Sequence, residues 1–240
     1  MSKKIIFNKY QKRADNYHWQ QISRNLFQFN AFVAARYQQV INLIPQKPQQ
    51  KILDIGCGDG VLLSLIKNSA LYGVDLDQSS LNYGASRVKA KFIQAPADKL
   101  PFKANFFDIV LATEIIEHLT QPEKLIQEAK RVLKPSGYLI LTTPVKQPGR
   151  LTDKLHVQEF SPTELRNLLR SHFQLITITQ SHPLCLKKIY TLTLFKFGRF
   201  HFDLLRWLIN IWVFLTGLNP FNLRLGQSSQ LFALAKQYDR

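Results

Sequence analysis

The middle of the chain alternates between short apolar runs and segments with helical spacing. From residue 51 onward, stretches of four to seven mostly apolar residues are separated by segments in which apolar residues recur every three or four positions. Apolar strands joined by helical connections are typical of a parallel sheet covered by helices on both faces. We therefore predict an α/β fold whose seven strands lie at residues 51–55, 71–75, 91–95, 107–112, 137–143, 173–179 and 230–237.

Local signals place the helices between these strands. Helical spacing predicts helices at 60–68, 78–88 and 122–133. Pro122 suits the first position of a helix, and "KPSG" at 134–137 is typical of a helix end. The sequence "SPTE" at 161–164 matches a capping box, so a further helix is expected to begin there.

Residues 1–48 are expected to form a helical cap ahead of a core that spans 49–182. Apolar residues recur at helical spacing from Ile22 to Ile44, which indicates one long amphipathic helix or two. Tyr17, His18 and Trp19 precede this pattern, and they either fold over a bound ligand or act as a hydrophobic anchor.

Residues 183–227 are expected to form an insert before the last core strand, which lies within 228–240. Arg199, Asp203, Arg206 and Asn210 would make one thin polar stripe on a helix that is otherwise almost entirely apolar. The apolar run 207–218 is too short to span a bilayer, which takes about 20 residues. The insert is therefore predicted to be either a lid over a pocket or a membrane-interface element.

The composition adds a charge imbalance to this picture. The chain has 32 Lys and Arg against 16 Asp and Glu, a net charge of +16, which favours an anionic partner or serves solubility alone. Only two cysteines are present, Cys57 and Cys185, so no disulfide framework is expected. With no secretory signal in the first residues, we expect a cytoplasmic protein that can lie on the inner face of a membrane.

The stretch "KILDIGCGDGVL" at 51–62 carries the first candidate chemistry. A strand that turns through Gly56, Gly58 and Gly60 into a helix exposes backbone N–H groups to a ligand that comes close to the main chain. The spacing departs from the dinucleotide fingerprint, because Val61 stands where its third glycine belongs.

Three aspartates follow successive strands. Asp54 could meet an ammonium group, Asp75 the hydroxyls of a ribose, and Asp98 an adenine amino group. This order fits S-adenosylmethionine better than a nicotinamide dinucleotide. The alternative is that the aspartates only cap helices.

Residues 50–180 resemble a class I S-adenosylmethionine-dependent methyltransferase, nearest to the ubiquinone/menaquinone-biosynthesis (type 11) group. The resemblance lies in "ILDIGCGDG", "GVDLD", "APADKLPF", "FDIVLATEIIEHL" and "EAKRVLKPSGYLILTTP". It implies a Rossmann-like, mostly parallel seven-stranded sheet with an antiparallel last strand. It also implies that Asp54, Gly56 and Gly58 hold the methionine part, Asp75 the ribose, and Leu76, Ala97 and Asp98 the adenine. The predicted cofactor site is completed by Cys57 (a packing residue rather than a nucleophile), Gly60, Thr113 and Glu114.

The segment "TEIIEHL" at 113–119 follows the fourth strand, so its polar residues should face the same cleft. His156 follows the fifth strand and could meet Glu117 and His118. We predict that these three residues are catalytic, with a histidine as base or orienting group and no bound metal. Two alternatives stay open: a divalent metal, as in the similar E-x-x-E-H pattern of small-RNA 2′-O-methyltransferases, and a structural role.

The predicted function is methyl transfer from S-adenosylmethionine to the oxygen or carbon of a small or amphiphilic acceptor, such as a quinol, a lipid or a lipid-linked sugar. The expected partners are this acceptor and an anionic membrane surface, with nucleic acid less favoured. The alternatives are an RNA 2′-O-methyltransferase and a non-catalytic cofactor-binding protein.

Overall fold

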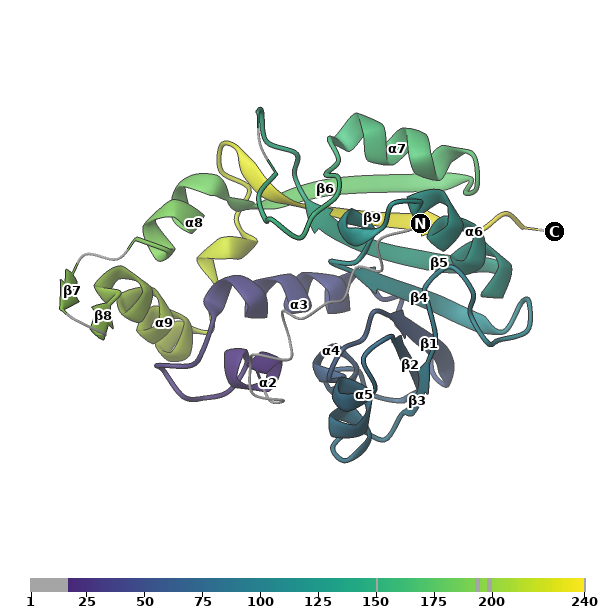
Figure 1. The fold of residues 1–240 in the computed structure, drawn as a ribbon, viewed down its shortest axis with the longest axis horizontal. Coiled ribbons are helices and arrows are strands. Elements are labelled where there is room, and N and C mark those ends of the chain that lie inside the picture. The colour runs from purple at the N-terminus through teal and green to yellow at the C-terminus, as the bar shows by residue number, and fades with distance from the viewer. Residues whose placement is uncertain (1–16, 150, 193–194, 198–199, 240) are drawn as a thin grey trace.

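A computed structural model describes residues 17–149, 151–192, 195–197 and 200–239, with the backbone alone at 195–197 and 200–202 (Figure 1). The main sheet has seven strands in the order β3-β2-β1-β4-β5-β9-β6. Strands β1 to β5 pair in parallel, and β9 runs antiparallel to both of its neighbours. The predicted fold class is therefore confirmed. The strands are β1 (Gln50–Ile55), β2 (Ser69–Asp75), β3 (Lys91–Gln94), β4 (Phe107–Thr113), β5 (Leu133–Pro144), β6 (Leu175–Pro183) and β9 (Ser228–Lys236).

Helices cover both faces of this sheet, as the apolar strands require. Side chains alternate along β1, so that Leu53 and Ile52 enter hydrophobic clusters on opposite faces. On one face lie α6 (Pro122–Val132) and α7 (Pro162–Arg170), and on the other lie α3 (Ala31–Leu43), α4 (Val61–Ser64) and α5 (Gln78–Ala85).

The position of β1 explains where a ligand would bind. Ile52 pairs with Leu71 of β2 on one side and with Ile109 of β4 on the other. The strand order reverses between β1 and β4, because the chain leaves β3 at the sheet edge and returns beside β1. In open parallel sheets such a reversal leaves a crevice beyond the carboxyl ends of the strands, which is a preferred ligand site.

Some predicted elements differ from the observed ones. The helix expected at 60–68 is only the single turn α4, because Leu65 and Ile66 donate to carbonyls three residues back and tighten the chain out of the helix. The "KPSG" stretch lies in β5, which begins directly where α6 ends. The capping box at the start of α7 is confirmed, with Ser161 and Glu164 bonded reciprocally.

The N-terminal pattern folds into two helices rather than one long one. The first, α2, spans Tyr17–Gln21, and α3 begins only at Ala31. Asn30 is the N-cap of α3, since its side chain accepts from the backbone N–H groups of Phe32 and Val33. Ile22 and Leu26 consequently lie in the connecting turns.

The insert lies at one end of the molecule, beyond the sheet and next to α3 (Figure 1). It contains α8 (Leu184–Tyr190), a hairpin of β7 (Phe195–Phe197) and β8 (Phe200–Phe202), α9 (Leu204–Thr216) and the short η2 (Pro220–Asn222). Thus α9 begins after the start of the predicted polar stripe, and Arg199 lies outside the described residues. Within the described part of the chain, every helix is too short or too polar to cross a bilayer.

Candidate active site

The three glycines after β1 adopt left-handed backbone angles for two different reasons. Gly56, Gly58 and Gly60 have φ of +74°, +51° and +75°. A Cβ on Gly56 would lie 2.7 Å from Ile115 Cδ1, and one on Gly60 would lie 2.7 Å from Phe92 Cζ. Within the described part of the chain, a Cβ on Gly58 would meet the ring of His18 alone, at 3.8 Å. Packing therefore requires the outer two glycines, whereas the middle one leaves its backbone open to a ligand.

A cleft of about 650 Å³, counted out to its open mouth, lies at this turn. Its walls come from the carboxyl ends of β1, β2 and β4 together with α2 and α3. Five acids line it although the chain as a whole carries +16. A cleft of this kind favours a cationic ligand and repels a pyrophosphate. The acids are Asp54, Asp59, Asp75, Asp77 and Glu114.

Asp54 and Asp75 lie side by side at the ends of β1 and β2. Asp54 is 1% exposed, and its Oδ1 has no hydrogen-bond partner among the described residues. Burial, with the charge of Asp75, raises the pKa of Asp54 well above its usual value. Asp75 accepts from the N–H groups of Gly58 and Asp77, each at 2.9 Å, and burial raises its pKa. An ammonium group at Asp54 would offset the free-energy cost of burying this charged carboxylate. Each carboxylate oxygen of Asp75 keeps a lone pair that can accept from a hydroxyl.

Helix α2 closes over the glycine turn. The Nδ1 atom of His18 lies 3.1 Å from Asp59 Oδ2, and Trp19 Nε1 donates to the backbone oxygen of Asp59 at 3.1 Å. Trp19 also packs against the hydrophobic cluster on that face of the sheet. Trp19 thus anchors the segment 17–19 to the core, whereas its folding over a bound ligand stays a prediction.

Glu114 is held by three elements at once. Its carboxylate accepts from Arg36 of α3 at 2.9 Å, from Thr142 of β5 at 3.0 Å and from Gln230 of β9 at 3.2 Å. Its backbone φ is +52°, which is uncommon for a residue other than glycine. The sequence analysis missed Arg36 and Asp59, since a basic residue on an amphipathic helix and an acid between two glycines carry no signal of their own.

The structure places some predicted cofactor residues outside the cleft. Leu76 is 56% exposed beyond β2. Gly60 packs against the ring of Phe92. Ala97 packs against the core, and Asp98 lines a separate shallow hollow. A contact of these residues with adenine stays a prediction. Those that line the cleft are Asp54, Gly56, Cys57, Gly58, Asp75, Thr113 and Glu114.

Cys57 is a packing residue rather than a nucleophile. It is 8% exposed, and its Sγ lies 2.7 Å from the position of a Cβ on Gly73. Burial, with the charges of Asp54 and Asp75, raises the pKa of its thiol well above the usual value. The thiol therefore stays protonated at neutral pH and reacts poorly.

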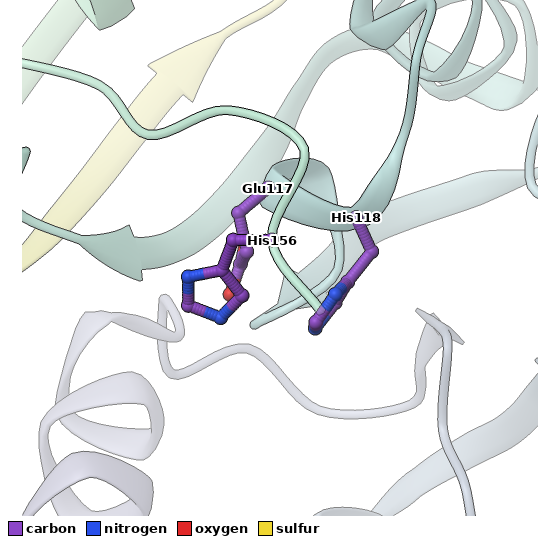
Figure 2. A group of neighbouring side chains, drawn as sticks. All are labelled: Glu117, His118 and His156. Carbon is purple, nitrogen blue, oxygen red and sulfur yellow. The ribbon is translucent and has the colours of Figure 1, made fainter. Parts of the chain in front are cut away.

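The three residues predicted to be catalytic form one cluster beside the cleft (Figure 2). Glu117 and His118 belong to the 3₁₀ turn η1 (Ile116–His118) after β4, and His156 comes from the loop after β5. The rings of His118 and His156 have centroids 5.0 Å apart. The loop is fixed to the turn because Val157 N–H donates to Glu117 O at 2.9 Å.

Glu117 is the most deeply buried member of this cluster. It is 1% exposed, and its Oε2 accepts from Thr143 at 3.1 Å. Burial, with the charge of Glu114, raises the pKa of Glu117 well above its usual value. The roles of Glu117, His118 and His156 in a reaction stay predictions.

The glycine turn and the acids at the ends of β1 and β2 lie within a stretch that matches a known family model. Residues 53–141 match the model of the methyltransferase domain. Residues 53–141 of this chain form a methyltransferase domain. The match includes β1, the glycine turn and the segment after β4, whereas the N-terminal cap and the insert lie outside it.

Curated proteins resemble about half of this chain. A probable S-adenosylmethionine-dependent methyltransferase of Mycobacterium tuberculosis is 33% identical over 144 residues, 56% of this chain and 53% of that protein. A Herpetosiphon aurantiacus (+)-O-methylkolavelool synthase is 29% identical over 58% of this chain and 49% of its own length. A ubiquinone/menaquinone biosynthesis C-methyltransferase of Vibrio parahaemolyticus is 31% identical over 42% of this chain and 45% of its own. The chain thus spans about half the length of these curated relatives.

Solved structures extend the likeness to the whole fold. A phosphoethanolamine N-methyltransferase of Haemonchus contortus, in complex with S-adenosyl-L-methionine, superposes with a TM-score of 0.67 at 18% identity. The superposition covers 98% of this chain and 59% of that one. At this identity the likeness shows that the two share a fold.

Proposed function

We propose that this chain transfers the methyl group of S-adenosylmethionine to an amphiphilic acceptor, such as a quinol, a lipid or a lipid-linked sugar, at an anionic membrane surface. The acid-lined cleft at the glycine turn carries the donor half of this proposal. The orientation of α9 supports the acceptor half.

The residues of the cleft fit the donor. S-adenosylmethionine has a cationic amine and a cationic sulfonium, which match the buried oxygen of Asp54 that lacks a partner in the described structure. We expect the carboxylate of Asp75 to accept the ribose hydroxyls, and the open backbone at Gly58 allows the linker between the amine and the ribose to pass close to the main chain. Bound there, the donor supplies a reactive methyl group, so that the protein has to position the acceptor atom at about 3–3.5 Å and to exclude water.

Helix α9 faces the protein with its polar residues. Asn210 is 1% exposed and donates to the backbone oxygens of Leu26 at 3.2 Å and Phe29 at 3.0 Å. It also accepts from the hydroxyl of Tyr190 at 2.8 Å, and Arg206 donates to Phe29 O. Two members of the thin polar stripe seen in the sequence, Arg206 and Asn210, therefore face the protein.

The opposite side of α9 is an exposed apolar surface. Leu215 and Leu218 are 81% and 66% exposed, and two tryptophans accompany them. An exposed patch of this composition marks an interaction site, and tryptophan is enriched at membrane–water interfaces. We define the α9 face as Trp207, Leu208, Trp212 and Leu215, together with Leu218 just beyond the end of the helix.

Charge favours an anionic bilayer as the occupant of the α9 face. The chain carries +16, and exposed cations flank the face in sequence, at Lys188 before it and at Arg224 after it. An interfacial helix binds by burying its apolar side among the lipids while basic residues meet anionic headgroups. This supports a peripheral position on the inner face of a membrane.

Helix α8 connects this surface to the site. Burial lowers the pKa of Lys187, which also senses the charges of Glu114, Arg36 and Glu159. Its ammonium group also lies over the ring of Phe32 of α3, 5.0 Å from the centroid, so the insert packs against the helix that carries Arg36. An acceptor with a polar head and an apolar tail would place its head beside the cleft and its tail along the insert.

The names of two relatives support this class of acceptor. One is named for C-methylation in ubiquinone and menaquinone biosynthesis, and the other for the formation of an O-methyl product. Each name concerns that protein, and the acceptor of this chain has to be found by experiment.

The acceptor is tested with the full chain, methyl-labelled S-adenosylmethionine and separated lipid, RNA and small-metabolite fractions. We expect label in the lipid fraction. Label in RNA that disappears at high salt would contradict the proposal and favour an RNA methyltransferase. Cofactor binding without transfer to any fraction would also contradict it and favour a non-catalytic binding protein.

The membrane contact is tested by co-sedimentation with phosphatidylserine-containing vesicles. Leu215→Glu removes an apolar contact worth about 1.5–3 kcal/mol, so vesicle binding should fall at least about tenfold. Leu175→Glu is the matched control, since Leu175 is 56% exposed on β6 and lies outside the α9 face. Equal loss in both variants would contradict the proposal. A second contradicting result would be that the chain binds no vesicles but self-associates, and that Leu215→Glu abolishes this self-association.

A further inference from the structure

Glu117, His118 and His156 form a compact group outside the lining of the cleft. One donor atom from each residue lies within 4.8 Å of the other two, and the three side chains come from two segments (Figure 2). We infer that this group binds a divalent first-row transition-metal ion of the Zn²⁺ type through one carboxylate oxygen and two imidazole nitrogens.

The carboxylate is the strongest sign of a ligand. Glu117 is 1% exposed, and its Oε1 is buried with no hydrogen-bond partner among the described residues, whereas Oε2 accepts from Thr143. A buried carboxylate oxygen is costly unless it is hydrogen-bonded, paired with a charge or bound to a metal. The two histidines supply the nearest atoms that could share a metal with it.

Both imidazoles are oriented as metal ligands are. The Nδ1 atom of His118 donates to the backbone oxygen of Leu155 at 3.1 Å, and Nδ1 of His156 donates to the carboxylate of Glu159 at 2.7 Å. In each neutral ring this places the lone pair on Nε2. Carbonyl and carboxylate partners of this kind fix the tautomer of metal-binding histidines.

The partners of His156 are themselves fixed. Glu159 has a side chain that is 0% exposed, and it accepts from the backbone N–H of Thr152 at 2.6 Å. Burial raises the pKa of Glu159, but the hydrogen bonds from Thr152 and His156 outweigh burial, so the pKa lies below its usual value. The second carboxylate is thus ionised and holds the ring of His156 in place.

The set of donor atoms selects the class of metal. Two nitrogens and one carboxylate oxygen suit Zn²⁺, Co²⁺ or Mn²⁺, whereas Mg²⁺ prefers oxygen ligands. Glu114 is not counted as a ligand, since Arg36, Thr142 and Gln230 hold its carboxylate. Three protein ligands leave one position open, as in catalytic zinc sites. With bonds of about 2.0–2.2 Å the ligand atoms would have to approach one another by roughly 1 Å.

The use of this metal rests on the proposed function. The open position would take the acceptor hydroxyl, and the ion would lower the pKa of that hydroxyl so that its proton leaves to water. The oxygen then forms a bond to the methyl carbon, and the bond from that carbon to sulfur breaks with its electron pair going to sulfur. As ligands, His118 and His156 cannot also remove the proton, so the metal replaces the base expected from the sequence.

Metal binding is tested on the full chain after treatment with a chelator. Co²⁺ is titrated and followed by its visible absorption, and Zn²⁺ and Mg²⁺ then compete for the site. We expect one equivalent of Co²⁺, displaced by Zn²⁺ and not by Mg²⁺ at the same concentration. His118→Ala and His156→Ala should each weaken binding at least about 100-fold, and Glu159→Gln about 10–100-fold. His172→Ala is the matched control, because His172 lies outside the group, at the end of α7.

Several results would overturn the inference. They are no binding at millimolar metal, binding that the two histidine variants leave unchanged, an equal loss in His172→Ala, and displacement by Mg²⁺. Glu117→Gln serves as a further variant only if its melting temperature matches that of the unaltered chain. Calorimetry with S-adenosylhomocysteine on the same samples separates the two proposals, since a failed metal site leaves cofactor binding intact and a failed cofactor site leaves the cobalt spectrum intact.

Discussion

Replacing Gly58 with alanine tests whether the cleft accepts a ligand against the backbone. The φ of +51° makes Gly58→Ala strained, which costs about 1–2 kcal/mol. For a chain of this length that corresponds to a fall in the melting temperature of roughly 2–8 °C. Among the described residues, the nearest atom to the added methyl group is His18 Cε1 at 3.8 Å, so the fold should persist.

The same methyl group would occupy the space where the ligand approaches the main chain. We therefore expect the affinity for S-adenosylhomocysteine, measured by titration calorimetry, to fall at least about tenfold, which is about 1.4 kcal/mol. Gly149→Ala is the matched control: Gly149 has a φ of +78°, and a Cβ there would meet nothing within 4 Å. It lies in the loop after β5, outside the cleft.

The comparison of these two variants separates strain from ligand contact. Both should lose similar stability, and only Gly58→Ala should lose affinity. If Gly58→Ala binds S-adenosylhomocysteine as tightly as the unaltered chain does, or if Gly149→Ala loses affinity equally, the reasoning about the glycine turn is refuted.

Three further predictions concern the scaffold around the site. Ser161→Ala removes the capping box of α7 and should lower the free energy of unfolding by about 0.5–2 kcal/mol in a urea titration; an unchanged midpoint would contradict the role of the cap. Asn210→Leu should destabilise the chain by about 1–3 kcal/mol although leucine is more hydrophobic, because the carbonyl of Phe29 and the hydroxyl of Tyr190 lose a buried partner. A more stable variant would show that Asn210 does not face inward as described. Burial lowers the pKa of His182 to about 3, below its usual value near 6.5, so only the unfolded chain takes up this proton between those pH values. Stability should therefore fall as the pH drops from about 6.5 towards 3, by up to about 1.4 kcal/mol per pH unit, and a His182→Gln variant with the same slope would refute this assignment.

The strands were the most predictable part of the fold. Leu53 and Ile52 are buried on opposite faces of the sheet, so β1 has to be apolar at successive positions, and such a run is visible in the sequence. The capping box of α7 was equally visible, because Ser161 and Glu164 satisfy each other locally. The helix after the glycine turn was overestimated, since Leu62 and Leu63 show helical spacing although the chain tightens after one turn.

The orientation of α9 could not be derived from its sequence. A helix that is apolar on most of its surface has no clear inward side, and the usual expectation turns its polar residues to water. Here Asn210 faces inward because the backbone oxygens of Leu26 and Phe29 need buried donors. Those oxygens lie about 180 residues away in sequence, beyond the reach of any local pattern.

The candidate site also has a part that could be predicted from the sequence and a part that could not. Asp54, Gly58 and Asp75 follow from the positions of strand ends, which the order of the elements fixes. The ion pair of Arg36 with Glu114 joins the N-terminal cap to the segment after β4, and its two partners are 78 positions apart. Pairing at this range depends on how α3 crosses the sheet, which the sequence alone does not reveal.

The most direct test of the cofactor cleft is a crystal structure of the chain grown with saturating S-adenosylhomocysteine. The account predicts density for the nucleoside beside the glycine turn, with the ribose hydroxyls on the carboxylate of Asp75 and the amino group of the homocysteine part facing Asp54. Density for the nucleoside at another surface, or a cleft that stays filled only by water at saturating ligand, would contradict it.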